Sequence, residues 1–317
     1  MKLGPGREFD RIRRFLDSVG PAPGVAVGPG DDCAVLADGT VLSIDLSIED
    51  VHFRRSWLTN EDIGYRAAAV SLSDLAACAA DPVGMLVSLA ISREENAGIG
   101  DAIMAGVKEA AALYGAPLLG GDLTRSPGPI IVDVAVVGRA QRPVLRSGAR
   151  PGDAVWVTGR LGAAARAVRD YIAGTPPARD AARAFTRPAP RIAQARWLAE
   201  RGVPTAMIDL SDGLAGDAAH IAAASDVRIV LRSRDVPLHD CARGALDLGL
   251  AGGDDYELCF TAPDEIVGRF LSAWRGAFGE LYRVGAVVAG SGVAIEDEHG
   301  VLHAWEGAGF DHFAGTP

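Results

Sequence analysis

Apolar and polar residues follow one another along this chain in short runs that predict both strands and helices. In the first half, apolar or β-branched runs closed by turn residues predict strands at 33–37, 40–45, 84–91 and 129–138. Apolar residues at helical spacing predict helices at 9–19, 61–80 and 100–114. This half therefore mixes strands and helices in an α/β or α+β pattern.

The second half repeats this mixture after a break rich in glycine and proline. The break, RSGARPGD at 146–153, is the expected boundary between two domains, 1–145 and 146–317. Strands are predicted at 154–159, 205–208, 228–233 and 282–290. Helices are predicted at 161–174, 190–202, 214–225 and 265–274. Two halves of similar size, each with an acidic motif at a strand end, suggest two related α/β domains.

The overall composition excludes several classes of protein. With 317 residues, 49% of them hydrophobic, the chain can bury a large core. Its net charge of −10 argues against binding to nucleic acid or to an anionic membrane, but not against an anionic substrate that arrives with metal ions. The N-terminus lacks the apolar core of a signal peptide, and the longest apolar runs are about half of the ~20 residues that a membrane helix needs. We expect a soluble, cytoplasmic protein whose four cysteines, which show no CxxC spacing, are reduced core thiols.

Aspartates are concentrated near the ends of predicted strands, most of them in stretches that contain glycine. They are Asp31, Asp32, Asp45, Asp74, Asp122, Asp209 and Asp212. Converging carboxylates repel one another unless cations lie among them. Oxygen-seeking cations such as Mg²⁺ are suited to this role, and Mg²⁺ commonly brings phosphate with it. The pattern therefore predicts a site for metal-loaded phosphates.

Asp74 gives the most specific signal among these acids. It follows Ile63, Ala67 and Val70 at helical spacing, which places a carboxylate on the apolar face of the predicted helix. An unpaired buried charge costs several kcal/mol, so this side chain needs a metal or cationic partner, or must stay protonated. The alternative is a second helix that begins at Ser71 or Ser73, with Asp74 in its first turn.

The other acidic motifs each have a structural alternative. GPGDD at 28–32 could share cations between its carboxylates, or be a solvated turn. Asp45 ends the predicted strand at 40–45, and could bind a ligand there or begin a turn. GGD at 120–122 could pack its backbone against phosphate, or form a β-turn. DLSDG at 209–213 could attract phosphate to a helix N-terminus, or only cap that helix.

The order of the motifs resembles a known family. The chain reads GDDCAVL, SxDx₆HF, SLSDLAAxxADP, GGDxTR, RSGAxPGDxxxVTG, RPxPR, MIDLSDG, GGDDYEL and GFDHF, and this series resembles the thiamine-monophosphate kinases. That family belongs to the superfamily that includes aminoimidazole ribonucleotide synthetase. The resemblance implies ATP-dependent phosphorylation of thiamine monophosphate to thiamine diphosphate. It also implies a two-domain subunit with mixed sheets and helices, which dimerises through its N-terminal domain and binds substrates between the halves.

The resemblance further implies a role for individual residues. The implied ligands of several Mg²⁺ ions are Asp31, Asp32, Ser43, Ile44, Asp45, Asp74, Asp122, Asp209 and Asp212. The implied ATP contacts are Gly121, Asp122, Arg146 and Ser211. The implied contacts to thiamine monophosphate are His52, Asp254 and Phe310, although the residues taken alone favour a structural role for the histidine.

Four residues depart from the family pattern. Ile44 stands where a threonine is frequent, and Leu123 also replaces a threonine. Asp254 replaces the usual glutamate, and Phe310 replaces a tyrosine or tryptophan, which keeps ring stacking but loses a polar group. Two other functions remain as alternatives: a sister enzyme that forms an acyl or amide phosphate, and a binding protein without turnover.

Overall fold

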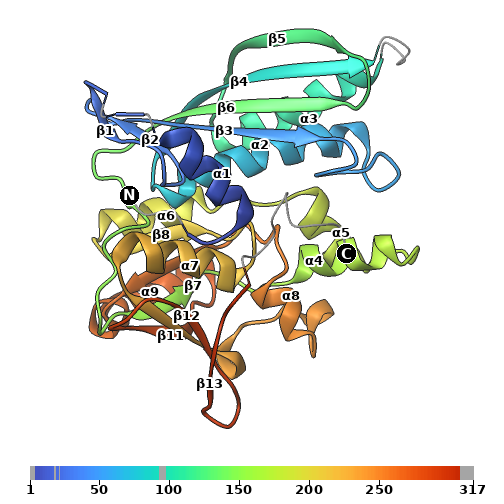
Figure 1. The fold of residues 1–317 in the computed structure, drawn as a ribbon. Coiled ribbons are helices and arrows are strands. Elements are labelled where there is room, and N and C mark those ends of the chain that lie inside the picture. The colour runs from blue at the N-terminus through green and yellow to red at the C-terminus, as the bar shows by residue number, and fades with distance from the viewer. Residues whose placement is uncertain (1–3, 18, 21, 93–97, 308–317) are drawn as a thin grey trace.

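The computed structural model describes residues 4–17, 19–20, 22–92 and 98–307. Within these residues the strands form two sheets, one from each half of the chain (Figure 1). The predicted mixed α/β architecture is confirmed. The predicted boundary after residue 145 falls between the last strand of the first sheet and the first strand of the second, and the division into two domains stays a prediction.

The first half contributes the strands of the N-terminal sheet and the helices that cover it. In chain order its elements are α1 (Arg7–Leu16), β1 (Val25–Val27), β2 (Ala34–Leu36), β3 (Thr40–Ile48), α2 (Asn60–Ala77), β4 (Asp81–Ser92), α3 (Gly98–Tyr114), β5 (Leu118–Ser126) and β6 (Ile131–Arg139). The strand order is β1-β2-β3-β6-β4-β5, with β4 and β5 parallel and the other neighbours antiparallel.

Alternation along β3 shows how the N-terminal sheet is oriented. Val41 is fully buried, whereas Leu42, Ile44 and Leu46 are exposed, because successive side chains of a strand point to opposite faces. The odd-numbered face packs against α2 and α3, and its apolar residues form the first core cluster. The even-numbered face carries apolar side chains that no described element covers.

Helix α2 is the central element of the molecule. It packs on α3 and on the N-terminal sheet, and it also contacts α6, β8 and α5 of the second half. Figure 1 shows it between the N-terminal sheet and the C-terminal half. A helix in contact on every side is expected to be buried all round, and most side chains of α2 are buried.

The second half contributes the C-terminal sheet and the helices on its two faces. In chain order its elements are β7 (Ala154–Val157), α4 (Ala163–Ile172), α5 (Arg179–Thr186), α6 (Ile192–Glu200), β8 (Ala206–Asp209), α7 (Leu214–Ser225), β9 (Arg228–Arg232), the short 3₁₀ helices η1 (Ser233–Asp235) and η2 (Asp240–Ala242), α8 (Leu246–Leu250), β10 (Leu258–Ala262), α9 (Asp264–Phe278), β11 (Tyr282–Val288), β12 (Gly292–Glu296) and β13 (Leu302–Ala304). The strand order is β13-β12-β9-β11-β7-β10-β8.

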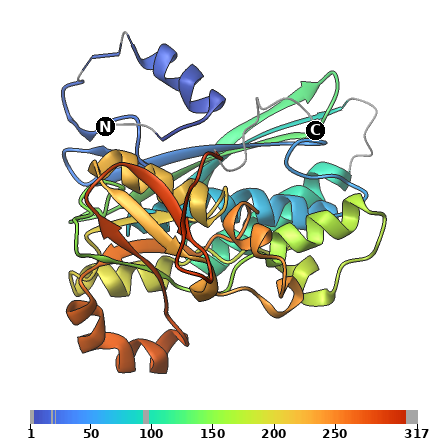
Figure 2. The same ribbon diagram turned by 60° about the horizontal axis from the view of Figure 1, so that its bottom comes forward.

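Two apolar clusters cover the faces of this sheet. Val155 and Ile208 belong to the cluster that includes α7, whereas their neighbours Trp156 and Met207 belong to the cluster that includes α6 and α9. The alternation along β7 and β8 therefore divides the helices between the two faces. Figure 2 shows α9 at the outer side of this half. In the part of the chain that the structure describes, no helix is both long and apolar enough to span a bilayer.

Some predictions of local structure are wrong. Strand β3 continues to Ile48, so Asp45 lies inside the strand and not at its end. GGD at 120–122 lies within β5 and not in a turn. Helix α2 runs without interruption through 71–74, so no second helix begins there; Thr59 caps the helix instead, accepting a hydrogen bond from the Asp62 backbone at 3.1 Å. The sequence analysis also missed α5, β12 and β13.

Candidate functional site

Asp74 on α2 provides the first carboxylate of the candidate site. The Ser43 hydroxyl of β3 donates a hydrogen bond to its Oδ2 at 2.5 Å. Burial, and after it the charges of Asp45 and Asp209, raise the pKa of Asp74 well above its usual value. The predicted carboxylate on the buried side of this helix is therefore confirmed.

Carboxylates from three separate segments meet at this point. Oxygen atoms of Asp32, Asp74 and Asp209 all lie within 4.8 Å of one another. Asp209 is the last residue of β8 and is buried, and the Ser73 hydroxyl of α2 donates to its Oδ2 at 2.5 Å. Burial and the neighbouring charge of Asp32 raise the pKa of Asp209 to about 7. This set, which we call the acidic cluster, lies where the two halves of the chain meet.

Arg146 supplies positive charge beside the acidic cluster. Its guanidinium Nη2 lies 2.6 Å from Asp32 Oδ1, and its backbone N–H donates to Asp31 Oδ2 at 3.2 Å. Burial first, and the charge of Asp32 second, raise the pKa of Asp31 to about 6 in spite of the arginine. In the structure this arginine is thus an ion-pair partner of the cluster, and its contact with ATP stays a prediction.

The oxygen atoms of the acidic cluster fit a hard divalent cation. Asp32 Oδ2 is buried and, among the described residues, has no hydrogen-bond partner. Leaving such an atom unsatisfied costs about 1–3 kcal/mol. One guanidinium cannot balance the three carboxylates, whose mutual repulsion a cation with oxygen ligands would relieve. Asp32, Asp74 and Asp209 are accordingly the residues that would hold Mg²⁺.

Asp45 adjoins the acidic cluster from β3. It is half-buried, and its charge is the second cause of the raised pKa of Asp74. Burial is the main reason that the pKa of Asp45 rises to about 6; a hydrogen bond from Ser71 opposes the rise and the charge of Asp133 adds to it. Although Asp45 lies inside the antiparallel strand β3, its carboxylate points towards α2, on the same face as Ser43.

Asp122 lies apart from these carboxylates. It is exposed on β5, at the edge of the sheet, in register with Ser88 of β4, which is also exposed. A Cβ atom on Gly121 would lie 1.8 Å from the Val87 carbonyl oxygen, so close packing of the strands already requires this glycine. The roles of Gly121 and Asp122 in binding ATP and metal stay predictions.

The turn after β8 brings a further acid to the site. The Asp212 backbone N–H donates to Asp217 Oδ2 at 3.1 Å, and Asp217 is buried in the first turn of α7. Burial, with the charges of Asp212 and Asp209, raises the pKa of Asp217 well above its usual value. The sequence analysis missed Asp217, although its place beside Leu214 and Ile221 on an apolar helix face is the same signal that identified Asp74.

A second ion pair joins the halves at the GGDDYEL segment. Arg66 of α2, which is buried, lies 2.5 Å from Asp254 Oδ1, and it also donates to the Phe185 carbonyl oxygen at 2.8 Å. The Tyr256 hydroxyl donates to the same Asp254 oxygen at 2.9 Å. The Asp254 backbone N–H donates to the Ser211 carbonyl oxygen at 2.9 Å, so this segment packs directly on the DLSDG turn. The sequence analysis missed Arg66.

The remaining predicted site residues are placed as follows. His52 accepts a hydrogen bond at Nδ1 from the Ile48 backbone N–H at 3.1 Å, which supports the structural role that the residues alone favoured. The side chain of Ile44 is 64% exposed on the uncovered face of β3, so only its backbone could contribute a ligand. Phe310 lies outside the described residues. The substrate contacts of His52, Asp254 and Phe310, and the ATP contact of Ser211, stay predictions.

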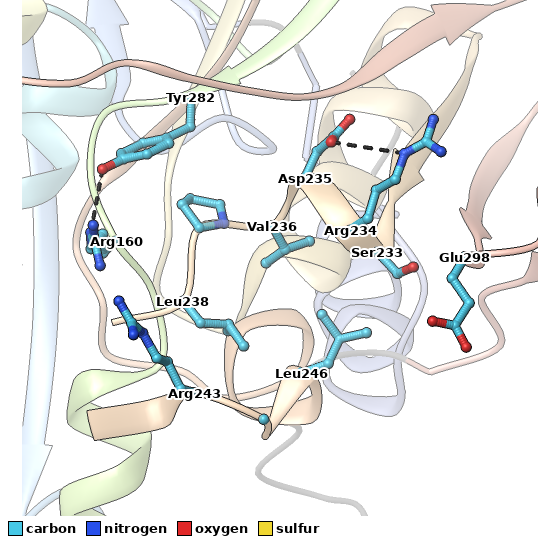
Figure 3. Close-up of a pocket in the computed structure, with 12 residues that line it drawn as sticks. Arg160, Ser233, Arg234, Asp235, Val236, Leu238, Arg243, Leu246, Tyr282 and Glu298 are labelled. Atoms are coloured by element: carbon cyan, nitrogen blue, oxygen red, sulfur yellow. Dashed lines mark hydrogen bonds and ion pairs between the residues drawn. The ribbon is translucent and has the colours of Figure 1, made fainter. Parts of the chain in front are cut away.

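A surface hollow of about 590 Å³ lies on the C-terminal half, away from these residues (Figure 3). Arg160 and Tyr282 stand on one side of it, and Val236, Leu238 and Leu246 form an apolar lining. Arg160 is already paired with Asp240 at 2.7 Å. Because the hollow contains none of the predicted site residues, we place the candidate site at the acidic cluster.

Comparison with known proteins agrees with this architecture. Residues 30–140 match the family of AIR synthase related proteins, N-terminal domain, and residues 150–298 match the C-terminal domain. Thiamine-monophosphate kinase of Escherichia coli O157:H7 is 36% identical over 98% of this chain and 99% of its own. The structure of AaThiL complexed with AMPPCP and TMP is similar with a TM-score of 0.83 at 30% identity, covering 97% of each chain. Thiamine monophosphate kinase from Aquifex aeolicus gives a TM-score of 0.80 at 28% identity, covering 94% of this chain and 96% of its own.

The chain is thus an AIR synthase related protein and, within that group, belongs to the thiamine-monophosphate kinase family. The family resemblance noted from the motifs is confirmed.

Proposed function

We propose that this protein transfers the γ-phosphoryl group of ATP to thiamine monophosphate, forming thiamine diphosphate and ADP. The observation that carries the proposal is the convergence of Asp32, Asp74 and Asp209 from both halves of the chain. A relative of similar fold is complexed with AMPPCP and TMP, which supports binding of both substrates by this architecture. The curated relatives favour this reaction over those of the sister enzymes.

The chemistry requires little from a general base. In a direct in-line transfer, a terminal phosphate oxygen of thiamine monophosphate attacks the γ-phosphorus. The bond from that phosphorus to the bridging oxygen breaks, and its electron pair leaves on ADP. The second pKa of a phosphate monoester is about 6, so the attacking oxygen is already largely ionised near neutral pH. The main task is to bring two polyanions together in line.

The residues of the acidic cluster suit that task. The chain contains no GxxxxGK[ST] motif, so its phosphates would not be held by a Walker-type loop. Bound Mg²⁺ would neutralise and align the phosphates. Ser43 and Ser73 each donate a hydrogen bond to one oxygen of a carboxylate, Asp74 and Asp209 respectively, which orients these acids for a ligand.

The proposal is tested by following ADP and thiamine diphosphate formation from ATP and thiamine monophosphate, with Mg²⁺ and with EDTA. We expect both products with Mg²⁺ and neither with EDTA. Asp209→Asn should lower turnover by about 100-fold or more, because a ligand for the transition-state charge is lost. Asp240→Asn, at an exposed ion pair, is the matched control and should keep normal turnover.

Failure would take one of two forms. If the wild-type protein forms no product but is thermally stabilised by ATP and Mg²⁺, it is a sister enzyme or a binding protein, and the proposed reaction is wrong. If Asp209→Asn keeps normal turnover, the enzyme is real but the metal assignment is wrong.

We further propose that two copies pair through the uncovered face of the N-terminal sheet. Leu42, Ile44 and Leu46 are 36%, 64% and 49% exposed there, and an apolar surface of this kind marks an interaction site. The family resemblance implies a homodimer through this half. Ile44→Lys should shift the mass seen by light scattering from dimer to monomer, whereas Val301→Lys, at an apolar residue elsewhere that is 52% exposed, should not. A monomeric wild-type protein would refute the pairing.

The cytoplasmic location stays a prediction.

A further inference from the structure

The surface hollow on the C-terminal half carries different charges at its two ends, and the proposed reaction does not use it. Arg160, Arg243 and Tyr282 stand at one end of the hollow, and Glu298 stands at the other (Figure 3). The apolar lining described above lies between these two ends.

The arginine end has more positive than negative charge. Arg160 Nη1 and Arg243 Nη2 lie 2.7 and 2.9 Å from the same oxygen atom, Asp240 Oδ1. One carboxylate thus offsets two guanidinium groups, each of which has five N–H donors. The Tyr282 hydroxyl, which accepts a hydrogen bond from Arg160 Nε at 3.4 Å, can donate its own proton to a ligand. Such a group of donors suits an anion with several oxygen atoms, such as phosphate or diphosphate.

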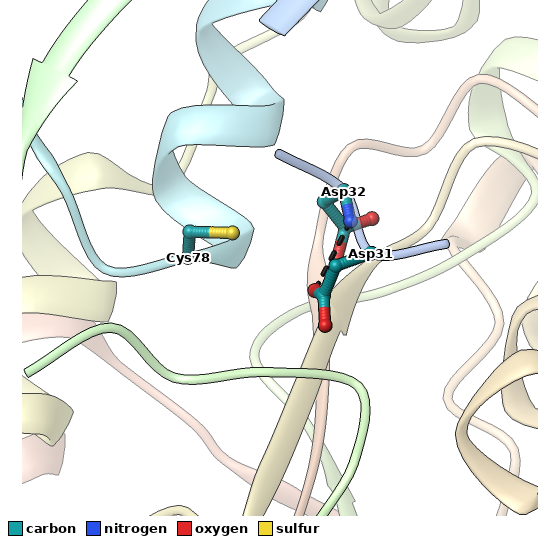
Figure 4. A group of neighbouring side chains, drawn as sticks. All are labelled: Asp31, Asp32 and Cys78. Atoms are coloured by element: carbon teal, nitrogen blue, oxygen red, sulfur yellow. Dashed lines mark hydrogen bonds between the residues drawn. The ribbon is translucent and has the colours of Figure 1, made fainter. Parts of the chain in front are cut away.

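These two arginines are more accessible to a ligand than Arg146 at the acidic cluster. The Arg146 side chain is 15% exposed and pairs with Asp32, which Figure 4 shows beside Asp31. The side chains of Arg160 and Arg243 are 44% and 72% exposed. The hollow therefore presents guanidinium groups to the solvent at a place where no ligand of the proposed Mg²⁺ lies.

A set of four charges near the opposite end is balanced. Arg232 and Arg234 each lie within 4.0 Å of both Asp235 and Glu296, so that two positive side chains meet two negative ones. Arg234 and Asp235 line the hollow, but their charges are offset within this set. The net charge of this end therefore depends on Glu298.

Glu298 gives this end a carboxylate that a ligand can reach. Its side chain is exposed, and its Oε1 lies 3.7 Å from His299 Nε2, which is charged only when the ring is protonated. With the histidine neutral, the end has one negative charge in excess. A positively charged group of a ligand would be attracted to it.

The apolar wall between the two ends is supported by the core. Val236 is buried in the cluster that includes α7, and Leu238 and Leu246 pack against that cluster. The Leu161 backbone N–H donates to the Pro237 carbonyl oxygen at 2.8 Å, which fixes the wall beside Arg160. The hollow is thus preformed, and its volume of about 590 Å³ lies within the range of roughly 300–1,000 Å³ that is usual for small-molecule sites.

We propose that this hollow binds an organic phosphate or diphosphate whose other end is a positively charged aromatic ring. The phosphate would lie between Arg160 and Arg243, the body of the ligand would contact the apolar wall, and Glu298 would pair with the ring. Thiamine diphosphate, the product of the proposed reaction, has this arrangement, with an anionic diphosphate and a cationic thiazolium ring. The choice of this compound rests on the proposed function, whereas the class of ligand rests on the hollow itself.

The test is isothermal titration of the full-length protein with thiamine diphosphate in EDTA, which withholds the metal that the acidic cluster needs. We expect one molecule to bind per chain. Arg160→Ala and Arg243→Ala should each weaken this binding by about tenfold, because charge-assisted hydrogen bonds to the diphosphate are lost. Arg275→Ala is the matched control: it removes an exposed arginine of α9 that pairs with Glu280 at 3.1 Å, and should leave binding unchanged. The melting temperature of each variant verifies that it is folded.

Two further ligands test the contribution of each end. Inorganic pyrophosphate should bind more weakly than thiamine diphosphate, and Glu298→Gln should not weaken it, because it has no ring. Glu298→Gln should weaken the binding of thiamine diphosphate by about two- to fivefold, as expected for an exposed ion pair. Thiamine without phosphate should bind much more weakly than thiamine diphosphate.

The outcomes separate this proposal from the proposed function. Absence of thiamine diphosphate binding in EDTA, or binding that is unchanged in both Arg160→Ala and Arg243→Ala, overturns the site. Pyrophosphate that binds as tightly as thiamine diphosphate overturns the role of the ring and of Glu298. A protein that binds thiamine diphosphate here but forms none from ATP and thiamine monophosphate with Mg²⁺ keeps the site and loses the proposed function, and the reverse result keeps the function and loses the site.

Discussion

Replacing Asp209 by asparagine should stabilise the metal-free protein while it removes activity. The substitution keeps the size of the side chain and an oxygen that can accept the hydrogen bond from Ser73, but it removes a buried negative charge next to Asp32 and Asp74. The pKa of Asp209 rises from 3.8 to about 7 in the folded protein. Since one pKa unit corresponds to about 1.4 kcal/mol, the ionised form costs the fold on the order of 4 kcal/mol.

The cost depends on pH in a defined direction. A carboxyl whose pKa is raised by folding binds more protons in the folded than in the unfolded state, so stability falls as pH rises between the two pKa values. For Asp209 this window lies between 3.8 and about 7. The unfolding free energy that Asp209→Asn gains over the wild type should therefore be small at the low end of this pH window and should reach its full value above the window. For a chain of this length, about 2–4 kcal/mol corresponds to roughly 4–8 °C in melting temperature.

The assay is thermal unfolding of both proteins in EDTA, at one pH near 4.5 and another near 8, followed by repetition with Mg²⁺. We expect Asp209→Asn to melt clearly higher than the wild type in EDTA at the higher pH, to differ little from it at the lower pH, and to gain less from Mg²⁺. Asp240→Asn controls for the loss of an exposed carboxylate. An Asp209→Asn protein destabilised by the same amount at both pH values would show that this carboxylate is held by favourable contacts, and our account of a repulsive cluster would be wrong.

Two further predictions concern packing and the second ion pair. A Cβ atom on Gly64 would lie 1.8 Å from the Ile103 carbonyl oxygen, so Gly64→Ala should force α2 and α3 apart and lower the unfolding free energy by roughly 1–3 kcal/mol or more. Gly268 lies in α9, and a Cβ atom there would meet no atom within 4 Å, so Gly268→Ala should raise the unfolding free energy by up to about 1 kcal/mol. Chemical denaturation measures both changes. Arg66→Gln should destabilise the protein by about 3 kcal/mol, because Asp254 loses its buried partner, whereas Arg66→Gln combined with Asp254→Asn should cost clearly less than the sum of the single variants. Additive effects in this double-mutant cycle would contradict the coupling.

The sequence predicted those features that depend on local spacing. The helix that carries Asp74 and the burial of that acid follow from the positions of Ile63, Ala67 and Val70 on one face. The same reasoning would have found Asp217, had it been applied to the helix after the DLSDG turn. Most strands of both sheets were also predicted, because their alternating or continuous apolar runs are closed by turn residues.

Features that depend on distant partners could not be predicted. Arg66 and Asp254 are 188 residues apart in the sequence, and a lone arginine on a helix gives no sign of which carboxylate it will meet. Strand β5 was missed because Gly120 and Gly121 were interpreted as a turn or a phosphate contact, whereas at the edge of the sheet Gly121 permits the close approach to β4. The strand position of Asp45 was wrong because the apolar run was cut at its first acid.

Helix α2 also has a consequence for how the molecule unfolds. Ser73 reaches Asp209 of the second half, Arg66 reaches Asp254, and Gly64 permits close contact with α3 of the first half. The helix therefore belongs to the core of the first half and also packs against the second, so neither half can lose its structure without exposing buried surface and ion pairs of the other. A chain with two separate sheets should in this case unfold cooperatively, as one calorimetric transition.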